Sequence, residues 1–186
     1  MTELVDDLLD VSRVTRGLVE LQLESIDVKA VVASALEQAQ PLIDSRGHTL
    51  TQHLTSPAAW VQGDKTRLVQ VLANLLNNAA KYTPQGGQIV LSLEVDQAQV
   101  RLSVGDNGSG IDPELLPRIF ELFTQAERTP DRAQGGLGMG LALVKHIVAL
   151  HGGQVQARSD GLGQGSVFTV TLPLGDNQTR NGPAQT

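Results

Sequence analysis

The chain has 186 residues, a formal net charge of −6, 40% hydrophobic residues and only 3% aromatic residues. This length suits one domain with short appendages, and its core must be built mainly from aliphatic side chains. The absence of cysteine excludes disulfides, thiolate metal sites and a cysteine nucleophile, and a negative charge without a basic run argues against nucleic acid as a partner.

The first 16 residues predict a helix with a narrow apolar stripe along one side. The stripe residues follow 3-4-3 spacing: Met1, Leu4, Leu8 and Val11. A stripe this narrow is typical of a helix that packs against a partner helix. Gly17 is expected to end this helix.

Two longer helices are predicted in the middle of the chain. Asp27 is a suitable N-cap for a helix over 28–45, which Pro41 is expected to kink. Asp64 can cap a second helix over 65–82, and the Thr-Pro pair that follows is expected to end it. Two shorter helices are expected at about 113–119 and 138–151.

Alternating apolar and polar residues, bounded by turn residues, predict the strands. The expected strands lie at 18–27, 48–54, 58–63, 87–95, 99–107, 153–158 and 166–172. The order of elements favours an α+β fold, in which a mostly antiparallel sheet is covered on one face by three helices to form a two-layer sandwich.

The helix over 65–82 carries a polar stripe, because Asn74, Asn78 and Lys81 fall on one side at 100° per residue. Asn77 lies to the side of this stripe. The opposite side is apolar and is expected to be buried: Leu68, Leu72, Leu75, Leu76 and Ala79. The stripe is either a solvated surface or a ligand site, since an amide oxygen can bind Mg²⁺ and a lysine can bind phosphate.

The stretch "VGDNGSGI" at 104–111 follows a predicted strand. Asp106 can accept a hydrogen bond from an exocyclic amine, while Gly108 and Gly110 allow the backbone to approach a flat ligand. The alternative is an ordinary Asp-Asn-Gly turn.

Glycines also precede the helix predicted in "GGLGMGLALVKHI", 135–147. The free N–H groups and the positive dipole end of a helix N-terminus suit phosphate, although the spacing matches neither the Rossmann motif nor the P-loop. Arg128 and Arg132 lie just upstream and either cover a triphosphate or are ordinary surface residues. Phe120 and Phe123, in "IFELF", are expected to pack in the core at the base of this loop.

Taken together and in this order, these stretches resemble the catalytic ATP-binding domain of two-component sensor histidine kinases. The family's N box is similar to "NLLNNAAKYT", the first glycine box to "DNGSGI", the F box to "IFELF" and the second glycine box to "GGLGMGL". A further "GLGQGS" precedes the last strand. The resemblance covers about residues 1–174, and four boxes in the correct order make it specific.

The resemblance implies the Bergerat fold, with ATP held between the helices and a lid. By the same resemblance, Asn78 would bind Mg²⁺ and Asn74 would line the phosphate end. Lys81 would contact phosphate oxygens and, with Asn74, take part in catalysis, whereas Tyr82 would pack near the ribose and adenine.

The resemblance also implies that Asp106 receives the adenine amino group and that Gly108 and Gly110 let the loop bend beneath the base. Thr169, on the last strand, would lie near adenine. Arg128 and Arg132 would belong to the ATP lid. The lid hinge and the phosphate-facing N–H groups would come from Gly136, Leu137, Gly138, Met139, Gly140 and Leu141.

The family's H box is not recognisable in the chain. None of the four histidines (His48, His53, His146 and His151) has the Glu or Asp, Leu and Arg that follow the phosphoacceptor histidine in the family. We therefore expect a fragment, with residues 1–17 as the end of the dimerisation and phosphotransfer hairpin, 18–174 as the catalytic domain and 175–186 as a polar linker or disordered tail.

The partners implied by the resemblance are ATP with Mg²⁺, a phosphoacceptor histidine hairpin in cis or in trans, the receiver domain of a response regulator, and a second copy in a homodimer. Some histidine kinases are hybrids that append a receiver domain, to which the polar tail is a candidate linker. We expect a cytoplasmic domain, because neither a signal peptide nor an apolar run of roughly 20 residues is recognisable.

Two alternatives remain open. The first is a Bergerat-fold ATPase or serine kinase. The related ATPases place a glutamate, the general base for water, where this chain has Asn74, and a neutral amide cannot take a proton at neutral pH. The second is a catalytically silent dimerisation or interaction module, which nucleotide titration would distinguish.

Overall fold

The computed structural model describes residues 2–55, 57–122, 124 and 139–175. Its helices are α1 (Thr2–Thr15), α2 (Val28–Ser45), α3 (Lys65–Tyr82), the 3-10 helix η1 (Leu116–Arg118) and α4 (Gly140–Leu150). Its strands are β1 (Glu24–Asp27), β2 (Thr49–Leu54), β3 (Trp60–Gly63), β4 (Gln88–Val95), β5 (Gln99–Asp106), β6 (Gln154–Arg158) and β7 (Ser166–Pro173). No helix in these described ranges is both long and apolar enough to cross a lipid bilayer.

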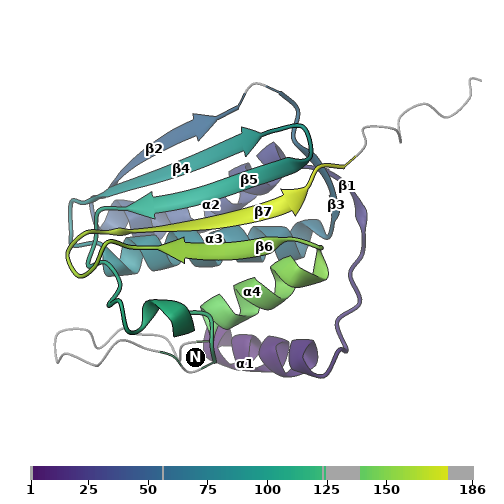
Figure 1. Ribbon diagram of the computed structural model, residues 1–186, viewed down its shortest axis with the longest axis horizontal. Helices are drawn as coiled ribbons and strands as arrows, with labels where there is room; N and C mark the ends of the chain where they lie inside the picture. Colours follow the sequence, from purple (N-terminus) through teal and green to yellow (C-terminus); the bar gives the residue numbers. More distant parts are fainter. Residues whose placement is uncertain (1, 56, 123, 125–138, 176–186) are drawn as a thin grey trace, which may run out of the picture.

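Five strands form the main sheet in the order β2-β4-β5-β7-β6, while β1 and β3 pair separately. Strand β2 runs parallel to β4, and the other neighbours are antiparallel. Helices α2 and α3 lie behind the sheet, and α4 continues the helical layer below them (Figure 1). This arrangement confirms the predicted two-layer α+β sandwich.

Helices α2 and α3 begin where their capping residues predict. The Asp27 side chain accepts a hydrogen bond from the Lys29 N–H, and the Asp64 side chain accepts one from the Arg67 N–H. The predicted apolar stripe of α3 is buried, with Leu75 only 1% exposed. Burial of one such leucine contributes about 1.5–3 kcal/mol, so this stripe fixes which side of α3 faces away from the core.

Strands β4 and β5 form the predicted antiparallel hairpin. Its turn is closed by Asp96, whose side chain accepts hydrogen bonds from the N–H groups of Ala98 and Gln99 at 3.0 and 2.9 Å. These two donors lower the pKa of Asp96 from its ordinary value, with the nearby Arg101 guanidinium adding to the effect. The hairpin register places Asp106 opposite Ile89, at the end of β5 that opens into the first glycine loop.

Two predicted elements are shorter than expected. The strand expected over 18–27 covers only 24–27, because its partner β3 has just four residues, and Gln22 N–H instead donates to the Asp64 side chain at 3.1 Å. The helix expected at 113–119 is reduced to η1. Pro117 lies within η1 and has no N–H to donate, so an α-helical hydrogen-bond pattern cannot continue through this position.

Helix α1 packs against α4 and lies at the edge of the domain (Figure 1). Its buried residues are Val11 and Val14, whereas Val5, Leu8 and Leu9 are between 49% and 56% exposed. Of the predicted apolar stripe, Val11 therefore faces this domain and Leu8 faces solvent. The side chains of Met1 and Leu4 lie outside the described part of the chain.

Candidate functional site

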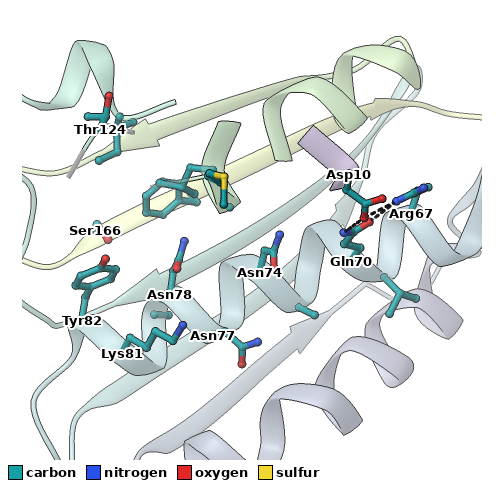
Figure 2. A pocket seen from close by; sticks show the side chains of 18 of the residues that line it. Asp10, Arg67, Gln70, Asn74, Asn77, Asn78, Lys81, Tyr82, Thr124 and Ser166 are labelled. Atoms are coloured by element: carbon teal, nitrogen blue, oxygen red, sulfur yellow. Dashed lines mark hydrogen bonds and ion pairs between the residues drawn. The ribbon is translucent and has the colours of Figure 1, made fainter. Parts of the chain in front are cut away.

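A large open cavity of about 1980 Å³ runs along one side of α3. Its other walls come from the loop after β5, from η1, from the start of β7 and α4, and from α1 (Figure 2). The cavity contains most of the sequence-predicted residues that the structure describes. We therefore treat it as the candidate functional site.

The polar stripe of α3 lines this cavity. Asn74 and Asn78 point into it from successive turns of the helix. Asn77 also borders the cavity, but its side chain is turned away from both (Figure 2). The Asn74 Nδ2 atom is buried and has no hydrogen-bond partner among the described residues. A buried amide donor without a hydrogen-bond partner costs free energy, so this atom is positioned to donate a hydrogen bond to a ligand or to water. Lys81 is exposed at the C-terminal end of the stripe.

Asp106 lies at the opposite wall, with both carboxylate oxygens engaged by protein donors. The Gly108 N–H donates to Oδ1 at 2.9 Å, and the Ser166 hydroxyl donates to Oδ2 at 2.7 Å. Two donors fix the plane of the carboxylate. The remaining lone pairs can accept a hydrogen bond from a ligand in the cavity.

Ser166 is a cavity residue that the sequence did not reveal. It is paired with Asp106 in the β5–β7 register and points towards the cavity. The prediction that Thr169 lies near the ligand is wrong, because Thr169 is three residues further along β7 and therefore points to the other face of the sheet. There its hydroxyl pairs with the Ser103 hydroxyl at 3.1 Å.

The first glycine loop requires its glycines. Gly110 has a φ of +66°, and a Cβ at this position would collide with the carbonyl oxygen of Gly161. A Cβ on Gly108 would lie 2.5 Å from the Tyr82 carbonyl oxygen. Ser109 also donates to that same oxygen, through both its N–H and its hydroxyl. The loop is thereby tied to the end of α3, where Tyr82 is 44% exposed at the cavity.

The start of α4 faces Asn74. A Cβ on Gly140 would lie 4.0 Å from Asn74 Nδ2, and Met139, Gly140 and Leu141 line the cavity. The N-cap residue Met139 makes no side-chain capping hydrogen bond, so among the described residues the first N–H groups of this helix remain available to a ligand. Five other predicted residues lie outside the described part of the chain: Arg128, Arg132, Gly136, Leu137 and Gly138.

Phe120 packs at the base of the site as predicted. Its ring meets that of Phe168 edge to face, with 6.1 Å between centroids and an interplanar angle of 87°. Phe168 is buried on β7 and lines the cavity. Phe123 lies outside the described residues.

A family model for histidine kinase-, DNA gyrase B- and HSP90-like ATPases matches residues 63–176, a span that includes α3, both loops and α4. The chain belongs to this family. Its relatives within the family are sensor histidine kinases, so the chain contains the ATP-binding catalytic domain of that class, and the predicted Bergerat fold is confirmed.

One such relative is the sensor histidine kinase TrcS of Mycobacterium tuberculosis, which is 38% identical over 183 residues, or 96% of this chain and 35% of TrcS. The histidine kinase AdeS of Acinetobacter baumannii is 31% identical, with a TM-score of 0.75 over 94% of this chain and 79% of the AdeS chain. Full-length ShkA in complex with AMPPNP is 32% identical, with a TM-score of 0.80 over 92% of this chain and 35% of ShkA.

This histidine kinase domain spans about a fifth to two fifths of the length of the curated relatives that it matches first. Within it, the structure gathers one stripe of α3, the first glycine loop, the start of α4 and Ser166 around a single cavity. A nucleotide fits this donor set, since a hydrogen-bond acceptor for a base and donors for phosphate line opposite walls.

Magnesium also fits the kinase site, through the amide oxygen of Asn78. No group of three or more His, Cys, Asp or Glu residues that could hold a metal ion exists in the described ranges. Mg²⁺ commonly binds nucleotide sites through one or two protein oxygens together with phosphate oxygens and water. A single amide oxygen beside a phosphate site is therefore a sufficient protein contribution.

Proposed function

We propose that the protein containing this chain is a sensor histidine kinase and that this domain presents the γ-phosphate of MgATP to a histidine of a phosphoacceptor hairpin. The observation that carries the proposal is the placement of Asn74, Asn78 and Lys81 on one cavity wall and the oriented Asp106 carboxylate on another. One wall suits phosphate and a cation, and the other suits a base.

At the base end, Asp106 accepts a hydrogen bond from the adenine amino group. Guanine carries a carbonyl oxygen at the corresponding ring position and cannot donate to a carboxylate there, so this contact selects ATP over GTP. Tyr82, at the end of α3, packs beside the ribose and adenine. The glycines of residues 107–111 let the backbone pass close beneath the base.

At the phosphate end, Lys81 and the first N–H groups of α4 bind the phosphate oxygens. Asn78 contributes its amide oxygen to Mg²⁺, which when bound neutralises negative charge on the phosphates. Asn74 lies between Asn78 and the start of α4 and donates its unpartnered amide N–H group to the phosphate end of the nucleotide. The lid arginines Arg128 and Arg132, with Gly136, Leu137 and Gly138, complete this end in the proposal.

In the transfer step, a nitrogen of the acceptor histidine forms a bond to the γ-phosphorus, and the bond from this phosphorus to the bridging oxygen of ADP breaks. The residues of the domain hold the reacting groups in line and offset the charge that develops on the oxygens. Asn74 is a neutral amide and removes no proton from water. The site therefore favours transfer to histidine over hydrolysis.

The acceptor hairpin, a response-regulator receiver domain and a second copy of the chain are the proposed partners. The half-exposed Val5, Leu8 and Leu9 of α1 support the second copy, since they give α1 an apolar side that the domain leaves uncovered. Because ATP is the substrate, the domain is placed in the cytoplasm.

Calorimetric titration with ATP, with and without Mg²⁺, tests the proposal. The wild-type chain is expected to bind ATP more tightly with Mg²⁺, and Asn78→Ala is expected to abolish this difference. Asn77→Ala is the matched control, because Asn77 is the neighbouring amide on α3 but is turned away from Asn78. Absence of any heat of binding in the wild type would contradict the proposal and indicate a silent interaction module.

A further inference from the structure

Ser159 directly follows β6 and connects two glycine loops at the base end of the cavity. Its hydroxyl oxygen accepts a hydrogen bond from the Ile111 N–H at 2.9 Å and donates one to the Gly165 carbonyl oxygen at 2.7 Å. Ile111 ends the first loop, residues 107–111, and Gly165 ends the second loop, residues 160–165. A single hydroxyl therefore joins the ends of both loops.

The two loops also pack directly on each other through their backbones. Gly163 N–H donates to the Ser109 carbonyl oxygen at 2.7 Å, and Gly165 N–H donates to that of Gly108 at 3.1 Å. A Cβ on Gly165 would collide with the carbonyl oxygen of Asp106, as one on Gly110 would with Gly161. With no space between them, a shift of one loop displaces the other.

The two donors that orient Asp106 lie in the first loop and directly after the second loop. The Gly108 N–H belongs to the first loop, and the Ser166 hydroxyl comes from the residue directly after the second loop. The direction of the Asp106 carboxylate therefore depends on the distance between the loops. Ser159 bridges that distance, although it is not among the residues that line the cavity.

We propose that Ser159 is a positioning residue for base recognition, whose hydroxyl sets the spacing of the two loops that aim Asp106 at the base. This inference rests on the proposed function, since it assumes that Asp106 receives the adenine amino group. Ser159 contacts no ligand atom itself. It acts through Ile111 on one side and through Gly165 and Ser166 on the other.

A purely structural serine would behave differently. Loss of its hydrogen bonds would lower the free energy of unfolding or weaken every nucleotide by the same factor. A positioning residue instead changes how well the site distinguishes a base with an amino group from a base without one. The useful measurement is therefore a ratio of two dissociation constants, which cancels effects common to both nucleotides.

The experiment compares Ser159→Ala, Ser159→Thr and wild type by calorimetry with ATP and with purine riboside triphosphate, which lacks the amino group. In Ser159→Ala, ATP binding is expected to weaken about tenfold, as for loss of one buried hydrogen-bonding partner, and the analogue by less than about threefold. Ser159→Thr retains the hydroxyl and is expected to keep the wild-type ratio.

Ser103→Ala is the matched control, because the Ser103 hydroxyl pairs with Thr169 on the face of the sheet away from the cavity. It is expected to leave both dissociation constants unchanged. Thermal melting checks that each variant is folded, and Ser159→Cys replaces Ser159→Ala if the latter does not fold, because a thiol is close in shape to the hydroxyl but only a weak donor and acceptor. In that case, a larger loss for ATP than for the analogue supports the proposal, and equal losses or none overturn it.

Equal weakening of both nucleotides in Ser159→Ala, or no weakening of either, would overturn the role of Ser159 and leave the proposed function intact. A wild-type chain that binds neither nucleotide would instead contradict the proposed function, and the inference about Ser159 with it.

Discussion

Replacing Asp106 with Asn is predicted to weaken ATP binding by about 10- to 150-fold. The carboxylate now accepts from Gly108 N–H at 2.9 Å and from the Ser166 hydroxyl at 2.7 Å. Asn has only one acceptor oxygen. This oxygen must face Gly108, because the Gly108 N–H can only donate a hydrogen bond. The amide NH₂ of the variant must then face Ser166, whose hydroxyl can rotate to accept.

In that arrangement the adenine amino group no longer has a charged acceptor. Where it approaches the NH₂ group of the variant amide, two donors face each other and no hydrogen bond forms. A hydrogen bond to a charged group is worth about 1.5–3 kcal/mol. Because about 1.4 kcal/mol corresponds to a tenfold change in the dissociation constant, losing this bond gives the predicted weakening of about 10- to 150-fold. The fold should change little, because the side chain keeps its shape and the Gly108 contact.

Calorimetry with ATP and purine riboside triphosphate measures this effect. The analogue has no amino group, so wild type and Asp106→Asn are expected to bind it with similar dissociation constants. If the variant bound ATP within about twofold of wild type, Asp106 would not be the acceptor of the adenine amino group. Equal losses for both nucleotides would show instead that the substitution had disturbed the loops.

Three further predictions concern the framework of the site. Leu75→Ala, at a position only 1% exposed, is expected to lower the free energy of unfolding by about 2–5 kcal/mol in urea titrations; a loss below about 1 kcal/mol would contradict the packing of α3. Gly110→Ala is expected to abolish ATP binding, whereas Gly86→Ala, with φ of +78° but open space around its Cβ, is expected to retain it. If both variants lost ATP binding to the same extent, backbone strain, and not the collision with Gly161, would explain the loss. Asp10→Asn removes the 3.0 Å ion pair with Arg67 and is expected to speed amide hydrogen exchange in α1 but not in the main sheet; unchanged exchange would mean that the ion pair does not hold α1 in place.

Local signals were sufficient to predict α3. Its N-cap Asp64, its stripe of buried leucines and the proline after Thr83 are all local, and the helix has the predicted bounds. The same stripe fixes which side of α3 carries Asn74 and Asn78, so their common orientation could be predicted before any tertiary contact was known.

Ser166 could not be found in this way, because its role depends on strand register. Ser166 and Thr169 are both hydroxyl residues on β7, and their separation of three places them on opposite faces. Only the pairing of β7 with β5, which sets Asp106 against Ser166, decides which hydroxyl faces the cavity. Register between strands distant in sequence is set by the whole sheet, and a local pattern does not contain it.

The two shortened elements have similar causes. Alternating apolar and polar side chains predict a strand over 18–27. A strand, however, extends only as far as a neighbouring strand pairs with it, and β3 has just four residues. The 113–119 segment has helical spacing, yet Pro117 interrupts its hydrogen bonds.

The roles of the individual site residues towards ATP and Mg²⁺ stay predictions.

The fate of the γ-phosphate tests the central claim most directly. The chain is incubated with Mg²⁺, ATP labelled at the γ-phosphate and a separate hairpin that carries a phosphoacceptor histidine, with the same hairpin lacking that histidine as a control. We predict acid-labile label on the histidine of the intact hairpin, none on the control hairpin, and little free phosphate. Label released as free phosphate at the rate of an ordinary ATPase, with none on the hairpin, would contradict the account.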